Sequence, residues 1–157
     1  MTSRSIHQWL TEYGESHKNK VNKLIHWICV PGIFLTIVGL LWSIPVPSYF
    51  AAVPYLNWAT LTMVPVVLFY LQLSPRIALG MIAFSFACLG LVDWYDQLSL
   101  LGVWQTSTAL FVVFWIMQFI GHHIEGKKPS FFEDLQFLLI GPAWVIGFLY
   151  RKVGIQY

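Results

Sequence analysis

Long apolar stretches separated by short polar ones fill the chain after residue 23. Between Leu24 and Pro75 there is no Asp, Glu, Lys or Arg. A helix that crosses a membrane needs about 20 apolar residues, so this stretch is long enough for two spans. The Ile-Pro-Val-Pro-Ser segment at 44–48 is typical of a turn and separates them. We therefore predict spanning helices over about 24–44 and 53–73.

Three further apolar runs follow. The third predicted span covers about 77–92, and Asp93 and Asp96 close it. The fourth covers about 103–121 and is followed by histidines at 122–123 and lysines at 127–128. The last run, about 131–150, is interrupted by Gly-Pro at 141–142, and we expect it to form a re-entrant or surface helix that does not cross.

The polar N-terminal segment, residues 1–23, is patterned as well. Its apolar residues recur at helical spacing: Ile6, Trp9, Leu10 and Tyr13. This spacing predicts an amphipathic helix that lies at the membrane interface. Asn19 and Asn22 then interrupt the pattern, and asparagine is a favoured cap at the start of a helix.

The composition places the whole chain in one class. Hydrophobic residues make up 57% of the 157 residues and charged residues only 10%, whereas soluble domains carry about 25% charged residues. A net charge of +2 is too small to indicate nucleic-acid binding. Cys29 and Cys88 have neither disulfide-framework nor zinc-type spacing. We predict a single all-α integral membrane domain over 1–157, with four transmembrane helices.

The basic residues indicate the orientation. With four crossings, all nine lie on one side of the membrane, which is the cytoplasmic side by the positive-inside rule. They are Arg4, Lys18, Lys20, Lys23, Arg76, Lys127, Lys128, Arg151 and Lys152. A fifth crossing would move the last two outward. Both termini are therefore expected in the cytoplasm, in the inner membrane of a bacterium or the endoplasmic reticulum of a eukaryote.

This topology brings histidines to one membrane face. His17 and His26 flank the entrance of the first span, and His122 closes the fourth. His17 and His26 are about half a turn out of phase on a continuous helix, so they can share an ion only if the chain bends within 18–22. Glu125 lies on the helix face of His122, whereas His123 points about 100° away.

Two interpretations of these side chains follow. Histidines at an interface often serve only as hydrogen-bonding groups. Imidazole also suits iron, zinc, copper and nickel, and a carboxylate beside it favours harder ions. The set His17, His26, His122 and Glu125 is thus a candidate mononuclear metal site with an open position. Lys127 and Lys128 are topology signals that can also hold an anionic substrate head.

Two motifs carry a family resemblance. They are Tyr13-x3-His17-x4-Asn22-x3-His26-x4-Pro31 and Gln118-x2-Gly121-His122-x2-Glu125-x3-Pro129. In this order, and bracketing the membrane region, they resemble the family of 2-hydroxy fatty acid dioxygenases named for metabolism of phytosphingosine to odd-numbered fatty acids.

The resemblance implies an iron(II)-dependent dioxygenase that shortens a 2-hydroxy fatty acid by one carbon. It implies catalytic roles for His17, His26 and His122 as Fe(II) ligands. The acid and dioxygen would be the substrates, with the acid's head near Asn22, Lys127 and Lys128 and its tail among the membrane lipids. The alternatives are a di-iron lipid hydroxylase, which usually carries eight or more histidines where this chain has five, and a small non-enzymatic structural or transport protein.

Overall fold

The computed structural model describes residues 5–98, 101–126 and 131–157. These residues contain six α-helices, one short 3-10 helix and no strand, which confirms the all-α prediction for the described part of the chain. The helices are α1 (Ile6–Glu15), α2 (Lys20–Trp42), η1 (Ser48–Ala52), α3 (Trp58–Leu73), α4 (Pro75–Gln97), α5 (Val103–Glu125) and α6 (Phe131–Lys152).

Three of the four predicted spans are helices long and apolar enough to cross a membrane, namely α2, α4 and α5. The second predicted span, about 53–73, is not confirmed. Residues 48–52 form η1, and α3 has only 16 residues, which at 1.5 Å per residue is about 24 Å against a hydrocarbon core of about 30 Å. The prediction treated the whole apolar run over 53–73 as one helix. In the structure Asn57 caps the start of the shorter helix α3 by accepting the N–H of Thr60.

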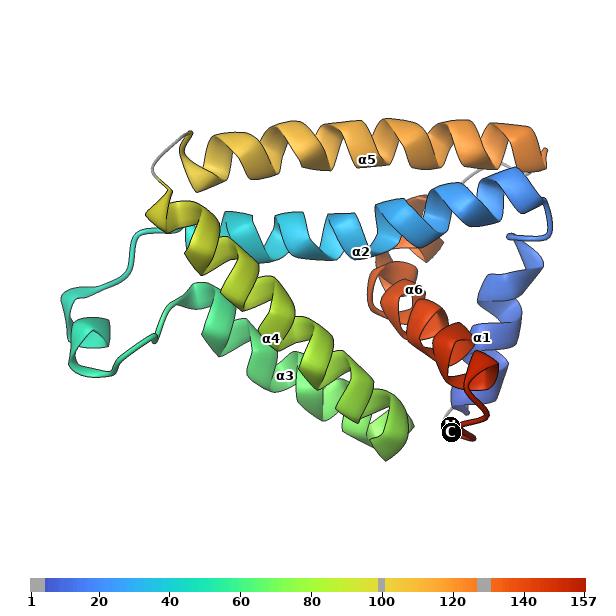
Figure 1. The fold of residues 1–157 in the computed structure, drawn as a ribbon, viewed down its shortest axis with the longest axis horizontal. Helices are drawn as coiled ribbons and strands as arrows, with labels where there is room; N and C mark the ends of the chain where they lie inside the picture. Colours follow the sequence, from blue (N-terminus) through green and yellow to red (C-terminus); the bar gives the residue numbers. More distant parts are fainter. Residues whose placement is uncertain (1–4, 99–100, 127–130) are drawn as a thin grey trace.

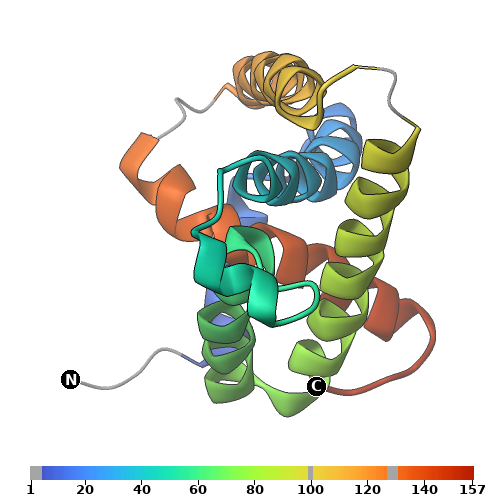
Figure 2. The ribbon, with the colours of Figure 1, turned by 90° about the vertical axis from the view of Figure 1, so that its left-hand side faces the viewer.

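Helices α2 and α5 run side by side along the long axis of the molecule (Figure 1). The view along this pair shows α5 on the outside, with α2 between α5 and most of the other helices (Figure 2). Small residues allow the pair to pack closely. A Cβ at Gly32 would collide with the ring of Phe114, and one at Gly39 with the hydroxyl of Ser107. Close approach at small residues is the usual packing of helices in lipid, where apolar burial alone does not hold helices together.

The outer face of α5 is apolar and exposed. Ile116, Phe119 and Ile120 are among its exposed side chains. In a water-soluble protein such a face would be an exposed hydrophobic patch, but hydrocarbon is its natural solvent. Together with the three long apolar helices, it indicates association with a membrane.

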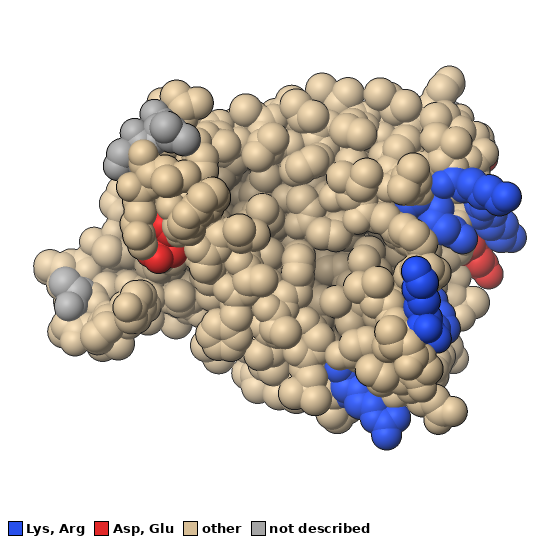
Figure 3. Space-filling model, in the orientation of Figure 1, with Lys and Arg blue, Asp and Glu red and all other residues tan. Residues whose placement is uncertain are grey.

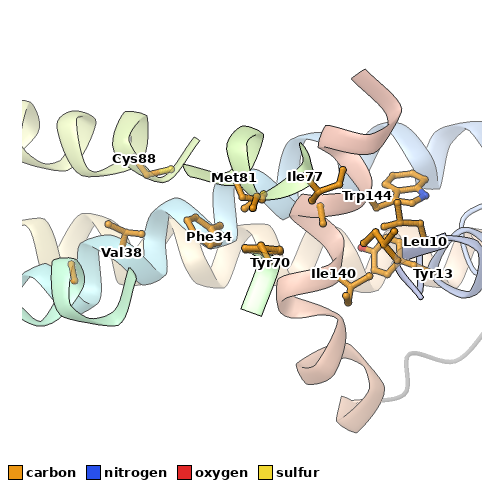
Figure 4. Packing of buried hydrophobic residues seen from close by; sticks show 14 of the residues in the cluster. Leu10, Tyr13, Phe34, Val38, Tyr70, Ile77, Met81, Cys88, Ile140 and Trp144 are labelled. Atoms are coloured by element: carbon orange, nitrogen blue, oxygen red, sulfur yellow. The ribbon is translucent and has the colours of Figure 1, made fainter. Parts of the chain in front are cut away.

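The N-terminal helix α1 forms as its pattern predicts, but another helix covers its apolar stripe. Ser5 and Gln8 form a capping box at its start. Leu10 and Tyr13 are buried, and α1 packs against α6. Figure 4 shows Leu10, Tyr13 and Trp144 gathered at this contact. Much of the amphipathic pattern in α1 therefore reflects packing on α6.

The C-terminal segment is one continuous helix, α6, without the turn that a re-entrant hairpin needs. Pro142 lies inside it and has no N–H to offer the carbonyl of Leu138. One residue further on, the hydroxyl of Tyr70 in α3 donates to the carbonyl of Leu139 (2.6 Å). Neighbouring helices commonly satisfy the backbone around a proline in this way.

The two ends of the molecule differ in charge. In Figure 3 the visible Lys and Arg side chains all gather toward one end, where one acidic patch also lies, and the opposite end near the end of α4 shows acidic side chains and no basic ones. At the basic end, Arg76 donates to the carbonyl of Gln156 (2.7 Å), and Tyr150 donates to the carbonyl of Arg76 (3.0 Å). The start of α4 and the end of α6 therefore lie side by side.

Candidate metal centre

A sharp bend between α1 and α2 brings His17 to His26. Helix α1 ends at Glu15, and α2 begins after Asn19, whose side chain accepts the N–H of Val21 (2.9 Å). The predicted bend and the predicted Asn19 cap are both confirmed, with the bend at residues 16–19, slightly earlier than expected. His17 lies in the bend itself, so its side chain can turn back toward α2.

Three histidines meet at this bend. His17, His26 and His122 each offer a ring nitrogen, and these ligand atoms all lie within 4.8 Å of one another. The ring centroids are 4.2 Å apart for His17–His26, 4.9 Å for His26–His122 and 5.7 Å for His17–His122. All three side chains are buried, with exposed fractions of 3%, 1% and 6%. Two histidines from the start of the chain thus meet one from its last third.

Backbone carbonyls orient two of these rings. Nδ1–H of His17 donates to the carbonyl of Tyr13 (2.6 Å), and Nδ1–H of His26 donates to the carbonyl of Asn22 (3.0 Å). A carbonyl only accepts, so the proton of each neutral ring is on Nδ1 and the lone pair is on Nε2. Both Nε2 atoms are buried and have no hydrogen-bond partner among the residues that the structure describes. Metal-binding histidines are held in the same way, by a hydrogen bond at the second ring nitrogen.

Burial keeps His17 neutral. Desolvation lowers the pKa of His17 from 6.5 to about 4, although the hydrogen bond to Tyr13 opposes the shift. The ring is therefore uncharged at neutral pH, which is the protonation state that binds a metal ion.

Glu125 and Asn22 lie beside the histidine cluster. One carboxylate oxygen of Glu125 accepts the backbone N–H of Lys18 (2.9 Å), and the other accepts the N–H of Asn19 (2.9 Å) and the Nδ2 of Asn22 (3.0 Å). Asn22 is fully buried and also donates to the carbonyl of Ser16 (3.1 Å). Glu125 is not a member of the group whose ligand atoms converge, and the side chain of Asn22 faces protein groups.

Aromatic side chains enclose His17. The Tyr13 ring stacks on it with centroids 4.3 Å apart and planes 14° from parallel, and Trp144 of α6 lies 5.5 Å away. Trp144 is buried. The sequence around Trp144 gives no indication of a site role, because tryptophan is common in membrane proteins as an interfacial belt residue. Only the packing of α6 on α1 places it beside the histidine cluster.

A small cavity of about 20 Å³ adjoins the cluster. Its wall includes His26, Val30 and Ile33 of α2 and Trp115 and Gln118 of α5. A space of this size holds about one water molecule. Gln118 lies one helical turn before His122, on the same face of α5, which gives this residue of the second motif a place in the site.

The remaining predicted residues lie apart from the cluster. His123 is exposed, which confirms that it faces away from His122. His7 is also exposed and stacks with Tyr157 near the C-terminus (5.6 Å). Lys127 and Lys128, the expected contacts of a substrate head, lie outside the described residues.

The donor set of the cluster fits one transition-metal ion. Nitrogens on a shared ion, each about 2.1 Å from it, are at most about 4.2 Å apart, so small side-chain adjustments suffice to bring the three rings onto one ion. Three protein ligands leave coordination positions open for small molecules. The orphaned, buried Nε2 atoms of His17 and His26 are costly without a partner, and an ion would satisfy them.

Comparison with known proteins identifies a family. The family model described as 2-hydroxy-palmitic acid dioxygenase Mpo1-like matches residues 3–153. This match covers almost the whole chain and confirms the resemblance inferred from the two motifs. No curated protein and no solved structure matches the chain.

Proposed function

Since this chain belongs to the 2-hydroxy-palmitic acid dioxygenase Mpo1-like family, we propose that it is an iron(II)-dependent dioxygenase that converts 2-hydroxy fatty acids into fatty acids one carbon shorter. The observation that carries this proposal is the buried group of His17, His26 and His122. The family name supports the substrate class and a redox-active ion, and neutral imidazole nitrogens are ligands that iron accepts.

The overall reaction needs no further reductant. The bond between C1 and C2 of the acid breaks, and one molecule of dioxygen balances the atoms and electrons for the shorter acid, carbon dioxide and water. Iron(II), when bound, supplies the redox chemistry that dioxygen needs for reaction with a singlet organic molecule. Zinc has no such redox chemistry.

The chain's own residues prepare the site for this reaction. His17, His26 and His122 would hold the ion, and the carbonyls of Tyr13 and Asn22 fix the first two rings in the tautomer that offers Nε2. Tyr13 and Trp144 pack against His17 and exclude water from it.

The substrate would enter from the membrane. The cluster lies near the polar ends of α2 and α5, so the acid's head stays at the membrane surface while its chain extends into lipid. Lys127 and Lys128 are the proposed partners of its carboxylate. With the basic residues on the cytoplasmic side, the site would face the cytoplasm.

Product analysis tests the proposal. Protein purified in detergent and given iron(II), oxygen and 2-hydroxypalmitate should yield the acid one carbon shorter, and palmitate without the hydroxyl should not be converted. Chelation of iron or removal of oxygen should abolish turnover. The His122→Ala variant should be inactive, while His123→Ala, which alters the adjacent exposed ring, should retain activity.

Metal analysis of the same purified protein, together with its turnover, separates the two alternatives. Within the described residues a single group of three converging ligands is found, which favours one ion over the two of a di-iron hydroxylase. Two irons per chain would contradict the proposal in favour of that enzyme. A native protein that carries only zinc, or no metal and no turnover, would contradict it in favour of a non-enzymatic role.

A further inference from the structure

The geometry around Glu125 points to a clamp, and we propose that Glu125 and Asn22 are positioning residues that lock the α1–α2 bend onto the end of α5 and thereby set the direction of His17. This inference rests on the proposed function, because it assigns these two side chains a task in building the metal centre. It differs from the expectation that Glu125 itself binds the ion.

The hydrogen bonds of Glu125 all go to the bend. Its carboxylate accepts from the backbone N–H groups of Lys18 and Asn19, which immediately follow His17, and from the side-chain amide of Asn22. These partners lie more than 100 residues earlier in the sequence. The bend is therefore held from the last turn of α5, the turn that also carries His122.

Asn22 extends this hydrogen-bonded clamp to His26. Its amide donates both to Glu125 and to the carbonyl of Ser16, the residue before His17. Its own backbone carbonyl accepts Nδ1–H of His26. One hydrogen-bonded network thus touches the residues next to His17, the ring of His26 and the helical turn of His122.

A carboxylate suits this place for a physical reason. All three partners are donors, and an ionised carboxylate offers only acceptor sites. Hydrogen bonds to a charged acceptor are roughly twice as strong as neutral ones. The carboxylate also lies at the N-terminus of α2, where the helix dipole favours a negative charge. An amide at position 125 would turn an NH2 group toward one of the donors.

Helix α5 ends directly after Glu125, at Gly126. Gly126 adopts a left-handed conformation with φ 74°, which glycine accepts without strain, and its N–H bonds back to the carbonyl of His123. The chain therefore leaves the helix directly after Glu125, so this side chain occupies the final turn and can reach across to the bend.

Hydrogen exchange on the metal-free protein tests the clamp without any activity measurement. In the Glu125→Gln variant, the amides of Lys18 and Asn19 should exchange at least tenfold faster than in the wild type, while amides in the middle of α4 should be unchanged. Cobalt(II) titration should show metal affinity weakened by about 10- to 100-fold, as expected when a group that orients ligands is removed. Asp96→Asn, which alters an exposed carboxylate near the far end of α4 and keeps an oxygen that can accept from Trp42, is the matched control and should leave both readouts unchanged.

The outcomes distinguish this inference from the proposed function. Unchanged exchange at Lys18 and Asn19 in metal-free Glu125→Gln, together with a loss of affinity, would overturn the clamp and make Glu125 a ligand. Faster exchange in a protein whose wild type binds no iron would support the clamp and reject the dioxygenase. If the Gln variant does not fold, Glu125→Asp serves, since it keeps the charge but is one methylene too short to reach all three donors. Wild-type protection in Glu125→Asp would overturn the proposal.

Discussion

Gly121 of α5 lies directly against the side chain of Asn22 in α2. A Cβ placed on Gly121 would collide with the Oδ1 atom of Asn22 and would come within 3.3 Å of the His26 ring. Gly121 also precedes His122 in the sequence. The absence of a side chain at this position therefore allows α5 to bring His122 close enough to His26 for the two rings to share an ion.

Replacing Gly121 with alanine should disrupt the metal centre. Because the added methyl meets the buried Asn22 amide, the helices must separate locally, and we expect a cost of about 1–3 kcal/mol in the free energy of unfolding together with weaker metal binding. Thermal unfolding in detergent and metal titration measure both effects. Gly90→Ala is the control, since nothing lies within 4 Å of a Cβ there, and it should be neutral or slightly stabilising. Equal stability and metal content in the two variants would contradict the prediction.

Each of the three clustered histidines should be needed for the ion. Alanine at position 17, 26 or 122 leaves two imidazoles, and we expect most of the bound iron to be lost in every case. Elemental analysis after reconstitution with iron(II) is the measurement. His123→Ala should keep its iron, because that side chain is exposed. Loss of iron in His123→Ala with retention in His122→Ala would show that the ion lies on the face of α5 that carries His123.

Acid should destabilise the metal-free protein through His17. Its pKa is 6.5 in the unfolded chain and about 4 in the fold, so between these values the unfolded chain binds more protons. The free energy of unfolding therefore has its full value above about pH 6.5. It falls as the pH approaches 4, and His17 accounts for about 3 kcal/mol of that fall. Denaturant unfolding as a function of pH measures the slope. In His17→Gln the free energy of unfolding should depend less steeply on pH over this interval. The same dependence in the variant and the wild type would refute the attribution to His17.

Trp144 should be needed for the enclosure of His17. Truncation to alanine removes a buried indole that lies 5.5 Å from the His17 ring and 5.4 Å from the Tyr13 ring. We expect a loss of about 3–5 kcal/mol of stability and weaker metal retention. The comparison is Trp94→Ala, whose indole is 58% exposed on α4 and whose loss should change stability little. Similar unfolding temperatures for both variants would contradict the role given to Trp144.

Cysteine labelling measures the orientation of the chain in the membrane. With Cys29 and Cys88 replaced, single cysteines at 20 and 152 should react with an impermeant reagent from the cytoplasmic side, and one at 97 only from the opposite side. The contacts that tie Arg76 to the C-terminal residues place positions 76 and 152 together. Labelling of 20 and 152 from opposite sides would make α6 a crossing helix.

Local patterns predicted much of this protein. The apolar runs indicated the membrane class and the three helices that are long and apolar enough to cross a membrane, because a helix satisfies its backbone polar groups by itself and its length follows from the run. The Asn19 cap, the need for a bend after His17 and the outward direction of His123 also depend on neighbouring residues alone. The spacing of His17, His26 and His122 within two motifs sufficed to name the family.

Long-range packing decided the rest. The apolar stripe of α1 is the same whether lipid or α6 covers it, so only the tertiary structure shows that α6 covers it and that Trp144 reaches His17. Helical periodicity put Glu125 on the face of His122, and a carboxylate there serves equally well as a metal ligand or as an acceptor for N–H groups. The fold brings Lys18, Asn19 and Asn22 to that carboxylate from more than 100 residues away. Hydrogen-bond partners at that separation depend on how the helices pack, which periodicity along one helix does not encode.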